Sequence, residues 1–270
     1  QTPVARVAPI WQEWIRRWPT LADFAAASGD EVLRAWGSLG YPRRALRLWE
    51  CAAAIGEGEV PADVDKLLRL PGIGDYTARA VACFHFGINV PVVDTNVRRV
   101  YARAEDGNFL APPPSKRELA AVAALLPERN GPRFSAALME LGALVCTAKN
   151  PDCRRCPLRA TCAWQLAGCP EPSAAEQTRA KKRVQKFAGT DRQVRGKILD
   201  VLRAADHPVP QSAIDVVWPD AAQRSRALAS LLDDGLAELD HVVLLDERGL
   251  DVQLRELGLA VGAEVLVAVA

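Results

Sequence analysis

Four of the seven cysteines lie in the segment CTAKNPDCRRCPLRATC, with six, two and five residues between them. Thiolates at this spacing can surround one zinc ion or one iron–sulfur cubane. In an intracellular chain such spacing indicates a metal site before it indicates disulfides. Arg154 and Arg155 lie inside the loop, where a bound metal centre would brace them against a phosphate backbone. The predicted metal ligands are Cys146, Cys153, Cys156 and Cys162.

A second motif, LPGIGDYT at residues 70–77, places a proline and two glycines between two helical patterns. Gly72 and Gly74 allow a tight turn with positive φ and leave backbone N–H groups uncovered. The following helix directs its N-terminal dipole the same way, so the motif predicts a phosphate site that needs no basic side chain. The alternative is an ordinary connection between two helices.

A carboxylate follows the hairpin twenty residues further on, in VPVVDTNVRRV. Asp94 ends an apolar run and leads into a helix that begins near Asn96, where the helix dipole favours the ionised form of a carboxyl group. Taken alone, Asp94 reads as a plain helix cap. The hairpin and Asp94 together are a more specific signal than either one alone.

The elements that carry these motifs read as helices throughout the first part of the chain. Trp11, Trp14 and Trp18 recur at helical spacing and are predicted to pack in a core, as are the later Trp36 and Trp49. The expected helical segments are several short helices in 1–58 and further helices at 62–69, 75–86, 95–104, 115–126 and 132–145.

The second part of the chain begins after a stretch rich in Pro, Ser, Ala and charge, which indicates a linker. Helices are expected at 192–204, 211–217 and 221–235, then a short hairpin at 236–246 and a strand-like C-terminal segment. This order is typical of a winged helix. The predicted domains are a core over 1–166, a linker over 167–190 and a small winged-helix-like α+β domain over 191–270.

Charge is distributed unevenly although the net charge is only +1. Residues 1–190 hold 26 Lys and Arg against 19 Asp and Glu, whereas residues 191–270 hold 8 against 14. A polyanion is therefore expected to dock on the first part. No apolar run is long enough to span a bilayer and no signal-like segment opens the chain, so we expect a cytoplasmic, nucleoid-associated monomer without a membrane partner.

Over roughly residues 1–165 these motifs resemble the MutY-type adenine DNA glycosylases of the helix-hairpin-helix, endonuclease III-like superfamily. The resemblance rests on QTPVARV, LGYPRRA, LPGIGDYT, VVDTNVRRV, ALMELGALVC and the four cysteines. It implies a bacterial protein with a two-lobed, mainly α-helical fold and a [4Fe–4S] cluster on those cysteines. It also leaves open a monovalent cation at the hairpin, and it implies double-stranded DNA with an adenine mismatch as the partner.

Position 76 distinguishes the branches of this superfamily. In endonuclease III-type bifunctional enzymes a lysine follows the hairpin and forms a Schiff base with the sugar. Tyr76 stands there in this chain, which implies a monofunctional N-glycosylase that leaves the strand intact. The resemblance implies that Asp94 stabilises the sugar cation and that Tyr76 and Asn96 orient it.

Further DNA contacts are implied near the start of the chain. Gln1 and Thr2 look like the end of the family's QQT signature, and Leu39 and Tyr41 look like its loop beside the mispaired base; the alternative for Tyr41 is a surface turn residue. The family's general acid, a glutamate, lies just before QQT and is expected upstream of Gln1. The only methionine is Met139, so the chain is expected to lack its natural start and to bind DNA better than it cleaves.

The expected function is removal of adenine mispaired with 8-oxoguanine or guanine. Residues 191–270 carry no NUDIX-like signature, so the reading of 8-oxoguanine is unexplained by the resemblance. One alternative is a thymine or uracil mismatch glycosylase, whose members also carry a tyrosine after the hairpin. The other is a DNA-binding iron–sulfur protein without catalysis.

Overall fold

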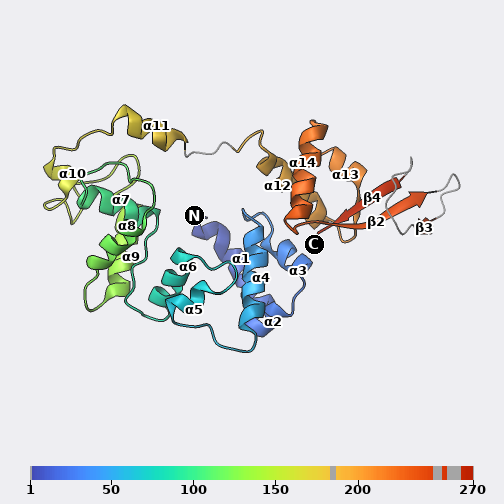
Figure 1. The fold of residues 1–270 in the computed structure, drawn as a ribbon, viewed down its shortest axis with the longest axis horizontal. Coiled ribbons are helices and arrows are strands. Elements are labelled where there is room, and N and C mark those ends of the chain that lie inside the picture. Colours follow the sequence, from blue (N-terminus) through green and yellow to red (C-terminus); the bar gives the residue numbers. More distant parts are fainter. Residues whose placement is uncertain (1, 183–186, 246–250, 254–262, 270) are drawn as a thin grey trace. The chain divides into compact units, whose positions relative to one another are not determined.

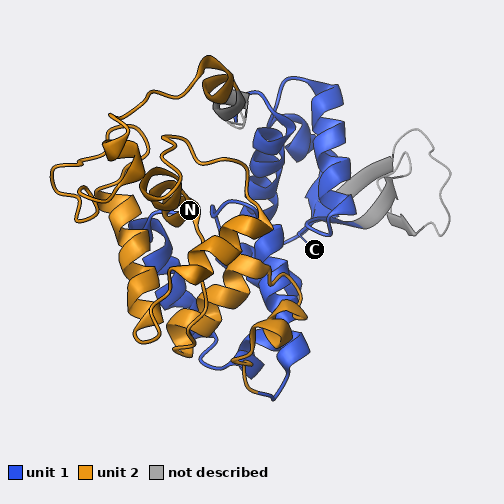
Figure 2. Cartoon of the chain, turned by 60° about the vertical axis from the view of Figure 1, so that its left-hand side comes forward, with its two compact units in different colours: residues 1–58, 186–270 blue, residues 59–185 orange. Residues whose placement is uncertain are grey.

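The computed structural model describes residues 2–182, 187–245, 251–253 and 263–269 (Figure 1). The chain divides into two compact units, here called unit 1 (residues 1–58 and 186–270) and unit 2 (residues 59–185) (Figure 2). The helices of unit 1 are α1 (Val4–Arg17), α2 (Leu21–Ala25), α3 (Gly29–Trp36), α4 (Arg43–Ile55), α12 (Asp191–Ala204), α13 (Gln211–Asp215) and α14 (Ala221–Asp233). The helices of unit 2 are α5 (Val64–Leu68), α6 (Asp75–Ala80), the π-helical turn η1 (Val81–His85), α7 (Thr95–Ala104), α8 (Lys116–Ala124), α9 (Gly131–Leu144), α10 (Ala163–Leu166) and α11 (Ala174–Lys182).

The mainly helical architecture expected from the sequence is confirmed. Local sequence signals account for several helix starts, because Thr20 and Ser28 form capping boxes at α2 and α3. Trp14, Trp18 and the later tryptophans of this region pack in or against the core of unit 1. Trp11 was wrongly expected there: its side chain is 60% exposed.

The core of unit 1 combines residues from both ends of the chain. Buried side chains of the first four helices, such as Leu33, lie in the same cluster as Ile198 on α12 and Leu231 on α14. Arg34 reinforces this connection, since its guanidinium donates to the carbonyls of Arg203 and Ala205 at 2.8 and 2.6 Å.

A small antiparallel sheet completes unit 1. Its strands are β1 (Val209–Pro210), β2 (Glu238–Leu245), β3 (Asp251–Gln253) and β4 (Ala263–Ala268), in the order β1-β4-β2-β3. Residues 236–246 were expected to form a hairpin, and that expectation is wrong: β2 runs through them as one strand and pairs with β3 and β4. The order of elements from α12 onward, helix–strand–helix–helix followed by three strands, agrees with a winged-helix-like domain.

Unit 2 carries the hairpin, the carboxylate and the cysteines. Helices α5 and α6 and the turn η1 pack through Leu67, Ala78 and Ala82, which are all buried. Part of the stretch expected as a linker is helical, since α11 lies within it. In the described part of the chain, no helix is long and apolar enough to cross a membrane.

Candidate active site

The hairpin of unit 2 joins α5 to α6 through a tight turn. The N–H of Ile73 donates to the carbonyl of Leu70 at 3.2 Å, and Gly72 has a φ of 73°, which favours glycine. Gly74 differs from the expectation: its φ is −99°, so only Gly72 needs the left-handed region. A Cβ at Gly74 would meet nothing within 4 Å, and α6 has no side-chain cap. The first N–H groups of α6 are therefore open to an approaching anion.

Asp94 is the N-cap of α7, and both of its carboxylate oxygens are engaged. Oδ1 accepts from the backbone N–H of Val97 at 2.7 Å, and Oδ2 accepts from Nδ2 of Asn96 at 2.8 Å. The side chain is half-buried. These two bonds fix the plane of the carboxylate, and the helix N-terminus stabilises its charge.

Arg99, which no sequence argument singled out, continues this network. Its guanidinium donates to Oδ1 of Asn96 at 2.7 Å and to the main-chain carbonyls of Gly142 and Cys146 at 2.5 and 2.7 Å. Asp94 is thus linked through Asn96 and Arg99 to the end of α9, where the cysteine loop begins. The doublet RR after Asp94 was the available signal, but sequence alone does not say which arginine turns inward.

Close packing of α7 against α9 supports the same network. A Cβ placed on Gly142 would lie 2.7 Å from Cβ of Asn96 and 2.8 Å from its carbonyl oxygen. Only glycine allows α9 to approach Asn96 this closely, so Gly142 helps to set the position of the residue that orients Asp94.

Tyr76 lies in the first turn of α6 with 47% of its surface exposed. Burial raises the pKa of its hydroxyl, and the negative charge of Asp94 raises it further. The second effect places the two side chains within electrostatic range of each other. Since the phenol stays protonated at neutral pH, it can serve as a hydrogen-bond donor beside the carboxylate.

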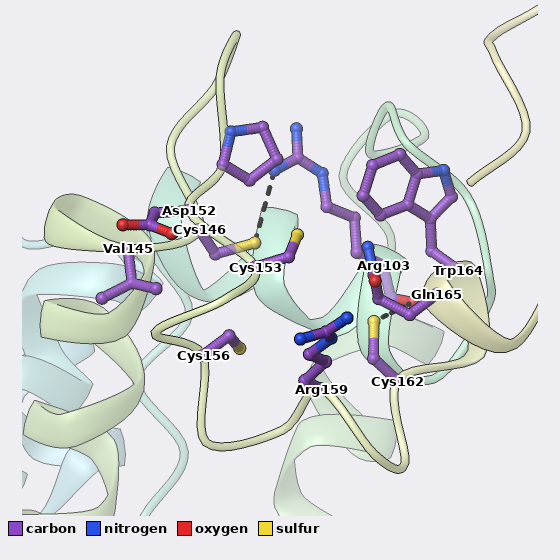
Figure 3. A pocket seen from close by; sticks show the side chains of 11 residues that line it. Arg103, Val145, Cys146, Asp152, Cys153, Cys156, Arg159, Cys162, Trp164 and Gln165 are labelled. Carbon is purple, nitrogen blue, oxygen red and sulfur yellow. Dashed lines mark hydrogen bonds between the residues drawn. The ribbon is translucent and has the colours of Figure 1, made fainter. Parts of the chain in front are cut away.

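The four cysteines of the loop line one pocket, whose empty space, with its open mouth included, is about 300 Å³ (Figure 3). In the described part of the chain, however, no group of three His, Cys, Asp or Glu side chains is arranged to hold a metal ion. Two of the four sulfurs make hydrogen bonds with Arg103: Sγ of Cys146 accepts from its guanidinium at 3.3 Å, and Sγ of Cys162 donates to its carbonyl at 3.4 Å.

Arg103 occupies the centre of the loop, and only 1% of its surface is exposed. Besides Cys146, its guanidinium donates to the carbonyls of Thr147 and Ala148 at 2.8 and 3.0 Å. It also lies 4.1 Å from the ring centroid of Phe109. A buried cation amid thiols suits a site that becomes anionic when the thiols lose their protons.

The donor set of this pocket fits a thiolate-bound metal centre. Burial raises the pKa of the Cys153 and Cys156 thiols, and charge on the neighbouring cysteines raises both further. A metal cation would relieve this repulsion between thiolates. Four sulfur ligands suit either zinc or an iron–sulfur cluster.

The remaining predicted site residues are spread over both units. Arg154 and Arg155 are exposed on the cysteine loop of unit 2. In unit 1, Thr2 is exposed, Leu39 is buried and Tyr41 is 56% exposed. Gln1 lies outside the described residues. Besides the four cysteines, unit 2 thus brings together Asp94 and Asn96, with Tyr76 within electrostatic range of Asp94.

Comparisons with known proteins agree with this geometry. Residues 1–121 match the family model of the HhH-GPD superfamily base excision DNA repair protein. The chain is 61% identical over 243 residues to an adenine DNA glycosylase of Mycolicibacterium smegmatis, covering 88% of this chain and 80% of that one. It is 41% identical over 172 residues to an adenine DNA glycosylase of Homo sapiens, covering 60% of this chain and 31% of that one.

Solved structures of related proteins share the fold. A thermostable thymine-DNA glycosylase matches with a TM-score of 0.57 at 27% identity, over 62% of this chain and 79% of that one. A trapped endonuclease III–DNA covalent intermediate matches with a TM-score of 0.54 at 27% identity, over the same shares. From its sequence and its fold, the chain belongs to the adenine DNA glycosylases of the HhH-GPD superfamily of base excision DNA repair proteins.

Proposed function

We propose that the chain removes adenine mispaired with 8-oxoguanine or guanine in double-stranded DNA by hydrolysing the N-glycosidic bond. The observation that carries this proposal is the carboxylate of Asp94, fixed through both oxygens at the start of α7 and close enough to Tyr76 for its charge to raise the pKa of the phenol. The adenine specificity is that of the relatives named above.

The hairpin holds the DNA backbone. The exposed backbone N–H groups at Gly72, Gly74 and the start of α6 donate hydrogen bonds to a phosphate. Binding therefore needs no basic side chain. A monovalent cation at the hairpin carbonyls would add charge at the same place. The open space around Gly74 lets the sugar–phosphate chain approach the protein backbone closely.

Asp94 acts on the sugar of the extruded nucleotide. The enzyme unstacks the adenine at a cost of a few kcal/mol and takes it out of the duplex. Positive charge develops on the sugar as the glycosidic bond lengthens, and the ionised carboxylate stabilises that charge. Water then attacks the sugar and leaves an abasic site.

The neighbours of Asp94 keep it in position during this step. Asn96 holds one oxygen, and Arg99 holds Asn96. Tyr76 stays neutral and donates a hydrogen bond, and it offers no amine for a Schiff base. The strand is therefore left intact. The leaving adenine must take up a proton as the bond breaks, and we assign that role to none of the residues described above.

We also propose that Cys146, Cys153, Cys156 and Cys162 hold a [4Fe–4S] cluster. When bound, the cluster ties the loop into one rigid unit, because it cross-links four points of the chain. Arg103 balances its negative charge from inside the loop. Arg154 and Arg155, on the outer surface, face phosphates.

Single-turnover base release tests the proposal. Duplexes that differ only in an 8-oxoguanine·A, G·A, G·T or G·U pair are compared. We expect release from the two adenine pairs and a loss of about 10²–10³-fold with Asp94→Asn. Asp220→Asn is the matched control, since Asp220 caps α14 in the same way.

Three results would contradict the proposal. If the Asp94→Asn variant released adenine at the full rate, the carboxylate would have no role in the reaction. Release of thymine or uracil in preference to adenine would assign the chain to the other mismatch activity, and no release of any base would leave a DNA-binding protein without catalysis.

A further inference from the structure

Unit 2 contains a second pocket beside the cysteine loop, and neither the catalytic nor the cluster proposal uses it. Its empty space, with its open mouth included, is about 990 Å³. Cys153 lines this pocket as well as the pocket of the four cysteines. Cys169, which follows the loop in the sequence, lines the second pocket and not the first. Two thiols, one of them a proposed metal ligand, thus border the same open space.

Cys169 acts on Cys153 through its charge. Burial is the largest cause of the raised pKa of the Cys153 thiol, and negative charge on neighbouring cysteines raises it further. Among these neighbours Cys169 has a larger effect than Cys162, which belongs to the loop itself. Since the interaction between two charges weakens with distance, Cys169 lies within the range over which the loop cysteines act on one another.

The backbone around Cys169 is fixed in an unusual conformation. Its φ is 59°, in the left-handed region that residues with a side chain rarely adopt. The N–H of Cys169 donates to the carbonyl of Trp164 at 2.9 Å, and Nε1 of Trp164 donates to the carbonyl of Pro170 at 3.0 Å. These bonds hold the chain on both sides of the thiol. Strain that the surroundings hold in place is typical of functional positions, and here it sets the direction of a sulfur.

The sulfur of Cys169 has the hydrogen bonding of a ligand thiolate. Nε2 of Gln165 donates to it at 3.0 Å, so the sulfur is the acceptor. A metal-bound thiolate has only this role, because it carries no proton to donate. Gln165 also lines the pocket of the four cysteines, and Lys149 adds positive charge to the wall of the second pocket. The side chains around Cys169 therefore suit the form of the thiol that binds metal.

The two other cysteines outside the loop lack these features. Cys51 is 5% exposed on α4 of unit 1, and Cys83 is fully buried in η1. Neither of them borders the two pockets beside the loop. Cys169, which is half-buried, is therefore the remaining thiol within reach of the metal site.

We propose that Cys169 is a reserve ligand of the metal site, and that it takes the place of Cys153 when the bond between Cys153 and iron breaks. In this exchange Cys153 takes up a proton as it leaves, and the thiol of Cys169 loses its proton and binds the iron. One iron–sulfur bond replaces another, so no electron is transferred and four thiolates still hold the cluster. The inference rests on the proposed [4Fe–4S] cluster.

Metal content after removal of single ligands tests the exchange in the full chain. Cys153→Ala, Cys156→Ala and the double variant Cys153→Ala/Cys169→Ala are purified without air, and iron and sulfide per chain are measured together with the visible absorbance of the cluster. We expect Cys153→Ala to hold iron within about twofold of the unaltered chain, and the other two variants to hold about tenfold less. Cys51→Ala is the matched control for the loss of a thiol away from the loop.

Alkylation identifies the exchanged thiol directly. Iodoacetamide is applied to the iron-loaded proteins, and mass spectrometry shows which cysteines carry the label. Cys169 should react in the unaltered chain, where it binds no metal, and should be protected in Cys153→Ala, where it binds iron. Equal labelling of Cys169 in the two proteins would overturn the inference.

A third measurement decides the question if Cys153→Ala does not fold, which circular dichroism reveals. A chelator removes iron from the unaltered chain and from Cys169→Ala, and the loss should be about tenfold faster without the reserve thiol. Equal rates of iron loss would contradict the exchange.

Iron in the unaltered chain separates this inference from the proposal on which it rests. If the unaltered chain binds no iron, the proposed cluster is wrong and the exchange is wrong with it. If it binds iron and Cys153→Ala loses as much as Cys156→Ala, the cluster stands and only the reserve ligand is refuted. Adenine release enters neither comparison.

Discussion

Gly142→Ala is expected to disturb the active site through backbone packing alone. The new Cβ would lie 2.7 Å from Cβ of Asn96, 2.8 Å from its carbonyl oxygen and 2.9 Å from its carbonyl carbon. Ordinary van der Waals contact begins at 3.4 Å. The closest of these atoms must therefore move by 0.7 Å, the difference between 3.4 and 2.7 Å.

The energy and the rate follow from that displacement. Overpacking of this kind costs about 1–3 kcal/mol, and the gain in helix propensity from Gly to Ala returns up to about 1 kcal/mol. We expect a net loss of about 1–2 kcal/mol in the free energy of unfolding. A displacement approaching 1 Å at a group that orients a catalytic residue lowers the rate by about 10–100-fold.

Chemical denaturation and single-turnover adenine release measure the two effects. Gly196→Ala is the control for stability, because it changes the same residue type in a helix with nothing within 4 Å; it should stabilise by about 0.5–1 kcal/mol. Val122→Ala, at a buried position on α8 away from the network, is the control for activity and should lose stability but keep its rate. A normal rate and normal stability in Gly142→Ala would refute the reasoning.

Two further predictions concern the same network. Arg99→Lys should lower the rate of adenine release at least about tenfold, because one ammonium group cannot reach the three oxygens that the guanidinium bonds. The content of iron and sulfide per chain, measured in the same samples, should stay unchanged. A normal rate would show that Arg99 has no role in positioning the site. Tyr76 should ionise only above its ordinary pKa of 10.0, and Asp94→Asn should lower the pKa of this tyrosine by removing a nearby negative charge. Ultraviolet titration of the tyrosines, compared with Tyr76→Phe, identifies the transition, and an unmoved midpoint would show that the two groups do not interact.

The raised pKa of Tyr76 also makes the stability of the folded chain depend on pH. Because its pKa is raised in the folded state, the unfolded chain releases the phenolic proton first as the pH rises. Its contribution to stability is therefore complete below pH 10 and declines above it. Tyr76→Phe removes that part of the alkaline loss of stability.

Local signals in the sequence were sufficient for much of the active site. The start of α7 at Asp94 could be predicted because an apolar run, an N-cap residue and a helical pattern follow one another directly. Gly72 could be predicted for the same reason, since turn chemistry is local. Gly74 was misjudged because the glycine pattern does not reveal which of two glycines takes positive φ.

Long-range contacts account for what the sequence did not disclose. Arg99 and Arg103 lie one turn apart on α7, and only the position of α9 and the cysteine loop decides what each one bonds. Trp11 follows the same period as Trp14, but one face of α1 remains exposed. The strand β2 was divided into a hairpin because its partner β4 lies beyond residue 260, too far away for a local pattern to indicate.

The assembly of unit 1 from both ends of the chain has a consequence for biosynthesis. A ribosome delivers α1–α4 first, yet their apolar side chains share a cluster with residues that emerge only after unit 2 is complete. Unit 2 can fold as soon as it leaves the exit tunnel, while the first four helices must wait with part of their apolar surface uncovered. The nascent chain therefore passes through a stage in which the apolar side chains of α1–α4 still lack their partners on α12 and α14.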